Sequence, residues 1–217
     1  MHPLAAAMSD AWQIIAPRFA AYELVIPGAP SFRCLMSDCA EHCCNRYTVN
    51  LSERDLERLT RLSGLSPRDF LECEDGQPIA LPLAQPWVLA RAEATCVFLK
   101  SDLACGQYEG RPNACRLYPH FVLFVDPSSG RPVYGDVSAI EESFARWLGG
   151  EPGNLVPVLT RHLACPGFGG PPLPEDEWRQ ILLSTARIQY APDCSYDWPM
   201  SAAAARVTIA TEARFPS

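Results

Sequence analysis

The sequence predicts an α+β fold: a small, helix-rich single domain with short strands organised around a multi-cysteine metal site. The chain has 217 residues, of which 48% are apolar and 20% are charged, as is usual for a globular protein. A chain of this length can bury about 70% of the surface that its unfolded form exposes. The 21 prolines and 13 glycines divide it into many short elements. Ten cysteines, most of them in blocks, occupy the segments between these elements.

The N-terminal residues 1–30 are expected to form an extension with one short helix around residues 11–16. The first cysteine block follows, and a helix is then expected to begin after Ser52. Ser52 is a good N-cap, and the acidic Asp55 stands at the third helical position. Gly64 stands where a C-terminal cap is needed, so this helix should end there.

A second short helix is predicted at Ser66–Asp69, because Pro67 suits a first helical turn. Pro112 predicts another helix start, which would place Cys115 in the first turn, near unpaired backbone N–H groups. Four segments rich in β-branched and aromatic residues are predicted to be strands, namely 87–91, 96–99, 121–125 and 131–134.

Three helices are expected in the last third of the chain. The first, 138–148, has a Ser-x-x-Glu start at Ser138; the second is 155–163; the third, 175–190, has amphipathic periodicity. Residues 167–174 read as a linker. The expected organisation is an N-terminal extension at 1–30, a cysteine-cluster metal-binding domain at 31–170 and a helical C-terminal segment at 171–217.

Charge and hydropathy exclude several function classes. The 18 basic and 25 acidic residues give a net charge of −7, and no run of Lys and Arg appears, so nucleic-acid binding is not expected. No apolar run approaches the roughly 18 residues of a membrane-spanning helix, so no membrane association is expected. The first residues lack the basic and apolar regions of a signal peptide. The expected location is therefore cytoplasmic, where thiols stay reduced.

The cysteines carry the functional signal, because eight of them fall in blocks that random core placement rarely produces. These predicted metal ligands are Cys34, Cys39, Cys43, Cys44, Cys96, Cys105, Cys115 and Cys165. Cys73 and Cys194 are interpreted as inert buried thiols. Disulfides explain the even count but suit small secreted scaffolds. Thiolates are soft ligands that select zinc, copper(I) or iron-sulfur centres.

The adjacent pair Cys43-Cys44 constrains any centre, because neighbouring side chains point in different directions on a helix or a strand. Either one member of the pair is a spectator, or each serves a different centre. Eight cysteines would complete two four-sulfur sites. His42, His120 and His162 lie near cysteines in the sequence and could replace a sulfur, although ordinary hydrogen bonding explains each of them more simply. Arg46, Arg111 and Arg116 are candidates to offset the negative charge of a thiolate centre.

The cysteine blocks resemble the YkgJ-like cysteine-cluster family of zinc- or iron-chelating domains. The matching pieces are FRC with the following C and CC, then CVFL, CGQYEGRPNACRLYP and CPGFGG. The family commonly opens with C-x2-C-x2-CC, whereas this chain has C-x4-C-x3-CC. That wider opening, followed by Tyr47, is similar to flagellin lysine-N-methylases, relatives that associate an iron-sulfur cluster with protein methylation.

Three functions are consistent with these patterns. The first is a metalloprotein that binds a 4Fe-4S cluster, or zinc as the alternative, in metal handling, redox sensing or protein modification, with a protein partner or substrate. The second is an iron-sulfur-dependent protein lysine methyltransferase. The third is a structural zinc module for protein–protein interaction. The absence of C-x2-C knuckles favours iron-sulfur over zinc. No residue is assigned a catalytic role.

Overall fold

The computed structural model describes residues 2–39, 42–83 and 85–190, and it confirms a mixed α+β architecture. Its α-helices are α1 (Pro3–Ile15), α2 (Cys43–Arg46), α3 (Glu53–Ser63), α4 (Asn113–Leu117), α5 (Val137–Leu148) and α6 (Glu175–Tyr190). Its strands are β1 (Tyr22–Leu24), β2 (Asn50–Leu51), β3 (Cys73–Glu74), β4 (Gln77–Pro78), β5 (Trp87–Val88), β6 (Arg91–Ala92), β7 (Thr95–Cys96), β8 (His120–Asp126), β9 (Arg131–Val133) and β10 (Val156–His162). Short 3₁₀ turns occur at Ala16–Arg18, Met36–Asp38 and Pro67–Asp69.

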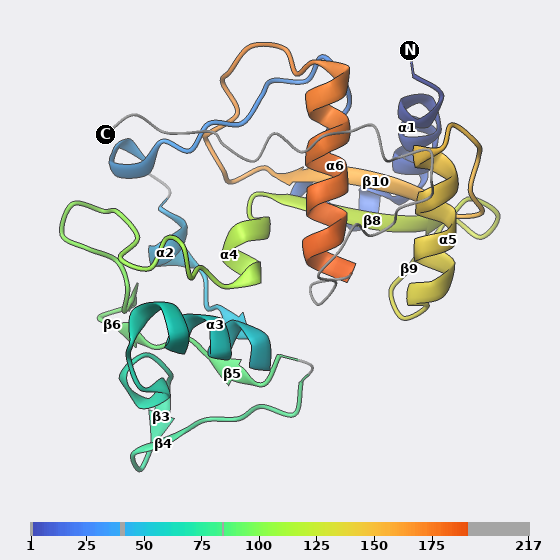
Figure 1. The fold of residues 1–217 in the computed structure, drawn as a ribbon. Helices are drawn as coiled ribbons and strands as arrows, with labels where there is room; N and C mark the ends of the chain where they lie inside the picture. The colour runs from blue at the N-terminus through green and yellow to red at the C-terminus, as the bar shows by residue number, and fades with distance from the viewer. Residues whose placement is uncertain (1, 40–41, 84, 191–217) are drawn as a thin grey trace.

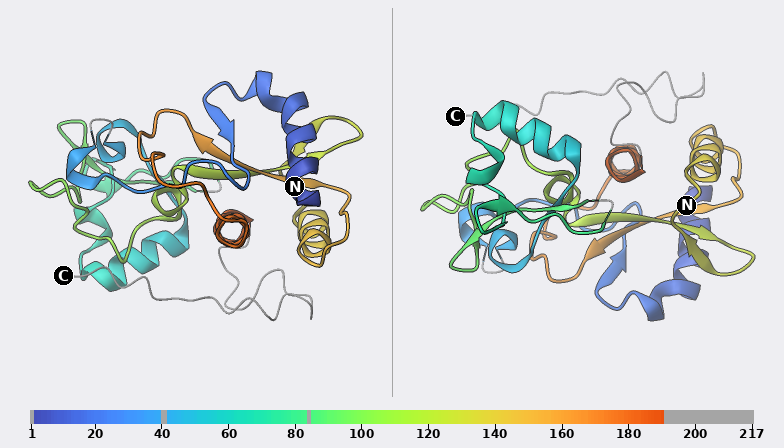
Figure 2. Two further views of the ribbon diagram at one scale, coloured as in Figure 1. Left: turned by 90° about the horizontal axis from the view of Figure 1, so that it is seen from above. Right: turned by 90° about the horizontal axis from the view of Figure 1, so that it is seen from below.

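The larger hydrophobic core surrounds a four-stranded antiparallel sheet with the order β1-β10-β8-β9. Helices α5 and α6 cover one face of this sheet, and α1 covers the other (Figure 2). Strand β8 is therefore buried on both faces, and all of its residues from Val122 to Val125 are buried. This double burial explains why its sequence is a continuous apolar run rather than an alternating one.

The end of α6 completes the hydrogen bonding of β8. Strand β9 pairs only with residues 124–126 of β8, so Val122 lies beyond its end. The side-chain amide of Gln189 accepts a hydrogen bond from the Val122 N–H at 3.0 Å and donates one to the Val122 carbonyl at 2.8 Å. Gln189 thus takes the place of a neighbouring strand at this position.

The predicted helix at 155–163 is wrong, because these residues form β10. A short, buried apolar run cannot be assigned to helix or strand by periodicity alone. The β-branched residues Val156, Val158 and Thr160 favour a strand, and pairing with β8 decides the outcome. Pro157 has no N–H to donate to a neighbouring strand. It is tolerated because β1 pairs only with residues 160–162 of β10, so no strand lies beside Pro157 on the β1 side.

The N-terminal segment contributes to the larger core. Helix α1 is longer than expected and buries Leu4, Met8 and Ile15 in the same cluster as β8 and α6. The indole of the buried Trp178 donates a hydrogen bond to the Val25 carbonyl at 2.9 Å. Hydrophobic packing therefore does not follow the boundaries expected at residues 30 and 170, and that division of the chain stays a prediction.

A smaller core lies beneath α3 and consists of Leu51, Leu59, Phe70, Leu71 and Leu89. The expected start and end of α3 are confirmed, with a Ser52–Asp55 capping box and a left-handed Gly64 at the C-cap. The turn at Pro67–Asp69 also has the expected capping chemistry. The N-cap of α5 is Asp136, not Ser138, because the Asp136 carboxylate accepts the Ala139 N–H.

Helices α2 and α4 lie between the two cores (Figure 1). The predicted strand at 96–99 reduces to the last residue of β7, and Val97–Leu99 turn away into a loop. Helix α4 begins after Pro112, as expected, and carries Cys115. Among the described residues, no helix is both long enough and apolar enough to span a membrane.

Candidate metal centre

Five cysteines from four separate segments converge between the two cores. Cys43 and Cys44 begin α2, Cys96 ends β7, Cys105 follows in the next loop, and Cys115 lies on α4. The Cys44 thiol is within hydrogen-bonding distance of the sulfurs of both Cys43 and Cys96. Cys105 and Cys115 are close enough to interact electrostatically with Cys43 and Cys96. The fold thus brings together cysteines that are spread over 73 residues of the sequence, from position 43 to position 115.

The charge balance of these thiols shows what the group can bind. Hydrogen bonding from Cys44 lowers the pKa of Cys43 to about 6 and that of Cys96 to about 6. The pKa of Cys44 is raised, because its protonated thiol hydrogen-bonds to the sulfurs of Cys43 and Cys96, with smaller contributions from burial and from the charges of those two thiolates. Burial raises the pKa of Cys115 to about 12. Ionisation of all these thiols together is therefore unfavourable without a cation, and a bound metal ion would offset their charge and displace the protons.

The loop that carries Cys105 is folded back on β7. Cys105 bridges with Leu99 in an isolated β-pair, and the Gly106 N–H donates to the Phe98 carbonyl at 2.8 Å. The imidazole Nε2 of His42 lies 3.0 Å from the Leu103 carbonyl oxygen. This contact joins the loop to the start of α2, so Cys96 and Cys105 are held beside Cys43 and Cys44.

His42, Cys43 and Cys44 form a compact set of donor atoms. One ligand atom from each lies within 4.8 Å of the other two, a spacing suited to metal coordination. A tetrahedral ion with Zn–S bonds of about 2.3 Å separates its sulfurs by about 3.8 Å, so donor atoms within 4.8 Å of one another are within reach of one metal ion. His42 is thus close enough to act as a ligand in place of one sulfur.

A buried carboxylate holds the first turn of α4, the helix that carries Cys115, and only the capping role of this carboxylate could be predicted from the sequence. Asp55 is 1% exposed. Besides capping α3, it accepts a hydrogen bond from the Asn113 N–H at 2.9 Å in the first turn of α4. The Arg58 guanidinium bonds the Asp55 carboxylate and also donates to the Arg111 carbonyl at 2.9 Å. Asp55 and Arg58 together attach α4 to α3.

Two arginines supply positive charge to the cysteine group. Arg91 donates to the carbonyls of Tyr47 at 2.6 Å and Asn45 at 2.8 Å, and its charge helps to lower the pKa of Cys96. Arg111 lowers the pKa of Cys105 and Cys115, although burial outweighs it at both. Arg111 was among the expected counter-charges, whereas Arg91 was not. Arg116 interacts instead with Asp55 and Arg58.

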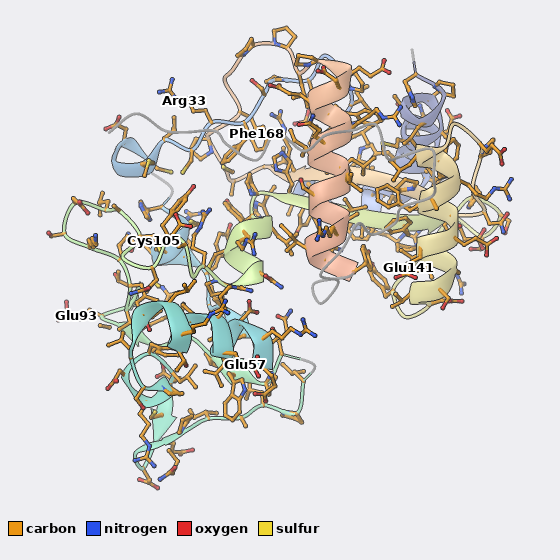
Figure 3. All side chains as sticks on the ribbon, viewed as in Figure 1. Arg33, Glu57, Glu93, Cys105, Glu141 and Phe168 are labelled. Atoms are coloured by element: carbon orange, nitrogen blue, oxygen red, sulfur yellow. The ribbon has the colours of Figure 1, made fainter. Side chains whose placement is uncertain are left out.

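The remaining three predicted ligands gather at the end of β10. Cys165 interacts electrostatically with Cys34, Cys39 and Cys43. Residues 31–33 run alongside 167–171, and the Arg33 N–H donates to the Gly167 carbonyl at 2.8 Å. Figure 3 shows the labelled Arg33 and Phe168 on these two neighbouring segments, apart from the loop of Cys105.

The structure also places the other cysteines and histidines. Cys73 is exposed on β3, so its assignment as a buried thiol is wrong. Cys194 lies outside the described residues. The nine described cysteines are all free thiols. His120 packs against Phe32 and Phe168, and His162 against Tyr22, Tyr47 and Tyr118, so both belong to aromatic clusters.

A comparison with known protein families agrees with this geometry. Residues 33–143, about half of the chain, match the CxxCxxCC family, whose description is "Putative zinc- or iron-chelating domain". The matched region contains seven of the eight predicted ligands and ends before Cys165. No curated protein and no solved structure matches the chain. The chain therefore belongs to the CxxCxxCC family of zinc- or iron-chelating domains.

Proposed function

We propose that the protein binds a 4Fe-4S cluster through thiolates drawn from Cys43, Cys44, Cys96, Cys105 and Cys115. The observation that carries this proposal is that these five cysteines, from four separate segments of the chain, gather in one group. A four-iron cluster is held by four cysteine thiolates, one for each iron. Apart from the adjacent pair Cys43-Cys44, each of these cysteines comes from a different element of the chain. This arrangement suits a 4Fe-4S cluster better than a zinc ribbon, in which the ligands come in C-x2-C pairs.

Zinc is the second candidate, because one specific observation favours it. The donor atoms of His42, Cys43 and Cys44 lie within 4.8 Å of one another, which is close enough for a single ion. An iron-sulfur cluster binds each cysteine to a different iron atom and so holds the sulfurs further apart. In the zinc case the centre is structural, and its loss should unfold the segments that carry Cys96, Cys105 and Cys115.

The proposed cellular role is metal handling, redox sensing or support of a protein-modifying system in a cytoplasmic, reducing setting. A hollow of about 430 Å³ next to Cys105 supports this role. It is lined by Leu62, Cys105, Gly106, Gln107, Tyr108 and Glu109. This hollow gives solvent and small solutes access to Cys105. A centre with an accessible ligand suits exchange or redox chemistry better than a fully enclosed structural site.

The positions of the glycines do not support a protein lysine methyltransferase. A methyl-donor site needs a glycine-rich turn between a strand and a helix. Instead, Gly153 packs against the backbone of Ser143, and Gly167 and Gly170 pack against residues 31–33. We therefore expect no binding of S-adenosylmethionine, and stabilisation of the protein by millimolar donor would revive this alternative.

The identity of the metal is tested by purifying the full chain without exposure to air. A 4Fe-4S centre predicts visible absorption, about four irons and about four acid-labile sulfides per centre. A colourless protein with stoichiometric zinc and no labile sulfide would reject the cluster in favour of the zinc candidate. Cys44→Ser should lose the metal, while Cys73→Ser, a matched change at an exposed cysteine on β3, should retain it.

A further inference from the structure

We infer that the chain holds two thiolate centres, and that Cys43 and Cys44 serve different ones. The first centre is formed by Cys44, Cys96, Cys105 and Cys115, and the second by Cys34, Cys39, Cys43 and Cys165. This inference rests on the proposed function, since it assigns a further site of the same metal-thiolate chemistry. Cys34, Cys39 and Cys43 lie within the region that matches the family and Cys165 lies beyond it, so the family match does not assign this set of four to one site.

The second site is built by a close backbone approach of two distant segments. The Ser31 N–H donates to the Pro171 carbonyl at 3.0 Å, and the Gly170 N–H donates to the Ser31 carbonyl at 3.2 Å. The Arg33 N–H donates to the Gly167 carbonyl at 2.8 Å. These antiparallel contacts bring Cys34, at the end of one segment, alongside Cys165, at the start of the other.

Glycines make this approach possible. A Cβ atom on Gly167 would lie 2.6 Å from the Arg33 carbonyl oxygen and 2.7 Å from the Phe32 ring. A Cβ atom on Gly170 would lie 2.3 Å from the Ser31 hydroxyl. The CPGFGG sequence therefore does more than link two regions: its first and last glycines allow residues 31–33 to lie directly against it.

The sulfur of Cys165 lies near three other cysteines. Cys165 interacts electrostatically with Cys34, Cys39 and Cys43, which come from the first cysteine block. Cys34 and Cys39 are separated by a 3₁₀ turn at Met36–Asp38 that curls the chain between them. Three thiols of the first cysteine block thus lie within electrostatic range of a thiol more than 120 residues further along the chain, and the described cysteines form no disulfide.

The adjacent pair on α2 divides between the two groups. Successive residues on a helix point about 100° apart, so the two side chains leave α2 in different directions, although their sulfurs still hydrogen-bond to each other. Cys44 contacts Cys96, which belongs to the first group. Cys43 lies between the groups: it interacts with Cys96, Cys105 and Cys115 of the first group and with Cys165 of the second. Tyr47, at the end of α2, packs against His162 near the end of β10, so α2 spans from one group to the other.

The resulting count is four sulfurs in each centre. Four is the number that a structural zinc ion or a 4Fe-4S cluster requires. With a single four-sulfur centre, by contrast, four of these eight cysteines would have no ligand role. Cys43 then holds the two centres close together, since its neighbour in the sequence is a ligand of the other.

Zinc titration of the metal-free, reduced full chain under anaerobic conditions tests this division, with native mass spectrometry counting the ions bound. We expect two zinc ions for the wild type. Cys34→Ser and Cys115→Ser should each bind one, and the double variant none. Cys43→Ser should behave like Cys34→Ser in losing the second centre, and Cys44→Ser like Cys115→Ser in losing the first. Cys73→Ser is the control and should bind two.

The outcomes separate the two proposals. If the wild type binds one ion that Cys115→Ser loses and Cys34→Ser retains, the second centre is wrong and the first stands. If the wild type binds no zinc and anaerobic purification yields no iron, both fail. If Cys43→Ser and Cys44→Ser lose the same ion, the division of the pair is wrong. Cys34 is exposed, so its replacement leaves the core intact, and circular dichroism of each variant identifies any that fails to fold.

Discussion

The Asp55 carboxylate accepts a hydrogen bond from the Asn113 N–H at 2.9 Å, and so joins the first turn of α3 to the first turn of α4. The same carboxylate accepts hydrogen bonds from the Ser52 N–H at 3.2 Å and the Ser52 hydroxyl at 2.9 Å, and it pairs with Arg58. One buried group therefore caps one helix and docks another. Because α4 carries Cys115, this contact sets the position of a proposed ligand.

Replacing Asp55 with Ala should lower the free energy of unfolding by about 3 kcal/mol, because it leaves Arg58 and the Asn113 N–H without their buried partner. It should also weaken metal binding about tenfold or more, since the support of Cys115 is lost. Urea denaturation and competition with a chelator measure the two effects.

Asp69→Ala is the matched control. Asp69 is also the third residue of a capping box, but its bond to the Ser66 N–H is exposed and α4 is not involved. We expect a loss of about 1 kcal/mol or less and unchanged metal affinity. Equal effects of the two substitutions would show that Asp55 acts only as a local cap.

Gly167→Ala should destabilise the protein by about 1–3 kcal/mol, because the new Cβ would overlap the Arg33 carbonyl and the Phe32 ring. It should also remove the zinc ion assigned to Cys34 and Cys165. Gly169→Ala is the control in the same loop, since a Cβ there meets nothing within 4 Å, and its effect should stay within about 0.5 kcal/mol. Thermal unfolding measures the stability of the two variants, and native mass spectrometry counts the zinc ions that they bind. Equal stability and equal zinc content in the two variants would contradict the close approach of Gly167 to residues 32 and 33.

Arg91→Lys should weaken metal binding about tenfold, because a single ammonium group cannot replace the two-pronged bonds of Arg91 to Tyr47 and Asn45. Those bonds hold the end of α2 against the hairpin that carries Cys96. Arg68→Lys, at an exposed site that bonds Gln77, should leave the affinity unchanged. A chelator competition in which Arg91→Lys retains the affinity of the wild type would show that this contact has no role in positioning the ligands.

Acid should destabilise the protein in part through His120. Burial, with a smaller contribution from Arg161, lowers the pKa of His120 to about 4, below the value of about 6.5 in the unfolded chain. The stability from the neutral ring is therefore full above pH 6.5 and is lost as the pH falls toward 4, because only the unfolded state takes up the proton in that range. At pH 5 the loss should be about 1–2 kcal/mol.

His120→Phe keeps a ring between Phe32 and Phe168 but removes the titrating group. The difference in unfolding free energy between pH 7.5 and pH 5 should shrink by about 1–2 kcal/mol in this variant. Comparing the two proteins cancels the contribution of the cysteines, which also titrate. An unchanged difference would show that His120 is already solvated in the folded state.

The sequence correctly predicted helices whose first and last residues are set by capping side chains close by in the chain. Ser52, Asp55 and Gly64 define α3 within twelve residues, and the structure agrees. The helix predicted at 155–163 was wrong because Val156–His162 is a short, mostly apolar run whose state depends on pairing with β8, more than thirty residues away. No local pattern contains that information.

The candidate site shows the same division between local and long-range information. The clustering of Cys34, Cys39, Cys43 and Cys44 is visible in the sequence, but the contact of Cys44 with Cys96 depends on how α2 meets β7. The role of Asp55 in docking α4 spans 58 residues, so only its capping role could be anticipated. Gly167 likewise read as part of a linker, because its close contact with Arg33 is created by the fold.

X-ray absorption spectroscopy at the edge of the metal found in the purified full chain tests the central claim most directly, because it reports the ligand atoms themselves. Coordination by the converged cysteines predicts a shell of sulfur at about 2.3 Å, with iron–iron scattering in addition if the centre is a cluster. A nitrogen and oxygen shell without sulfur would contradict thiolate ligation.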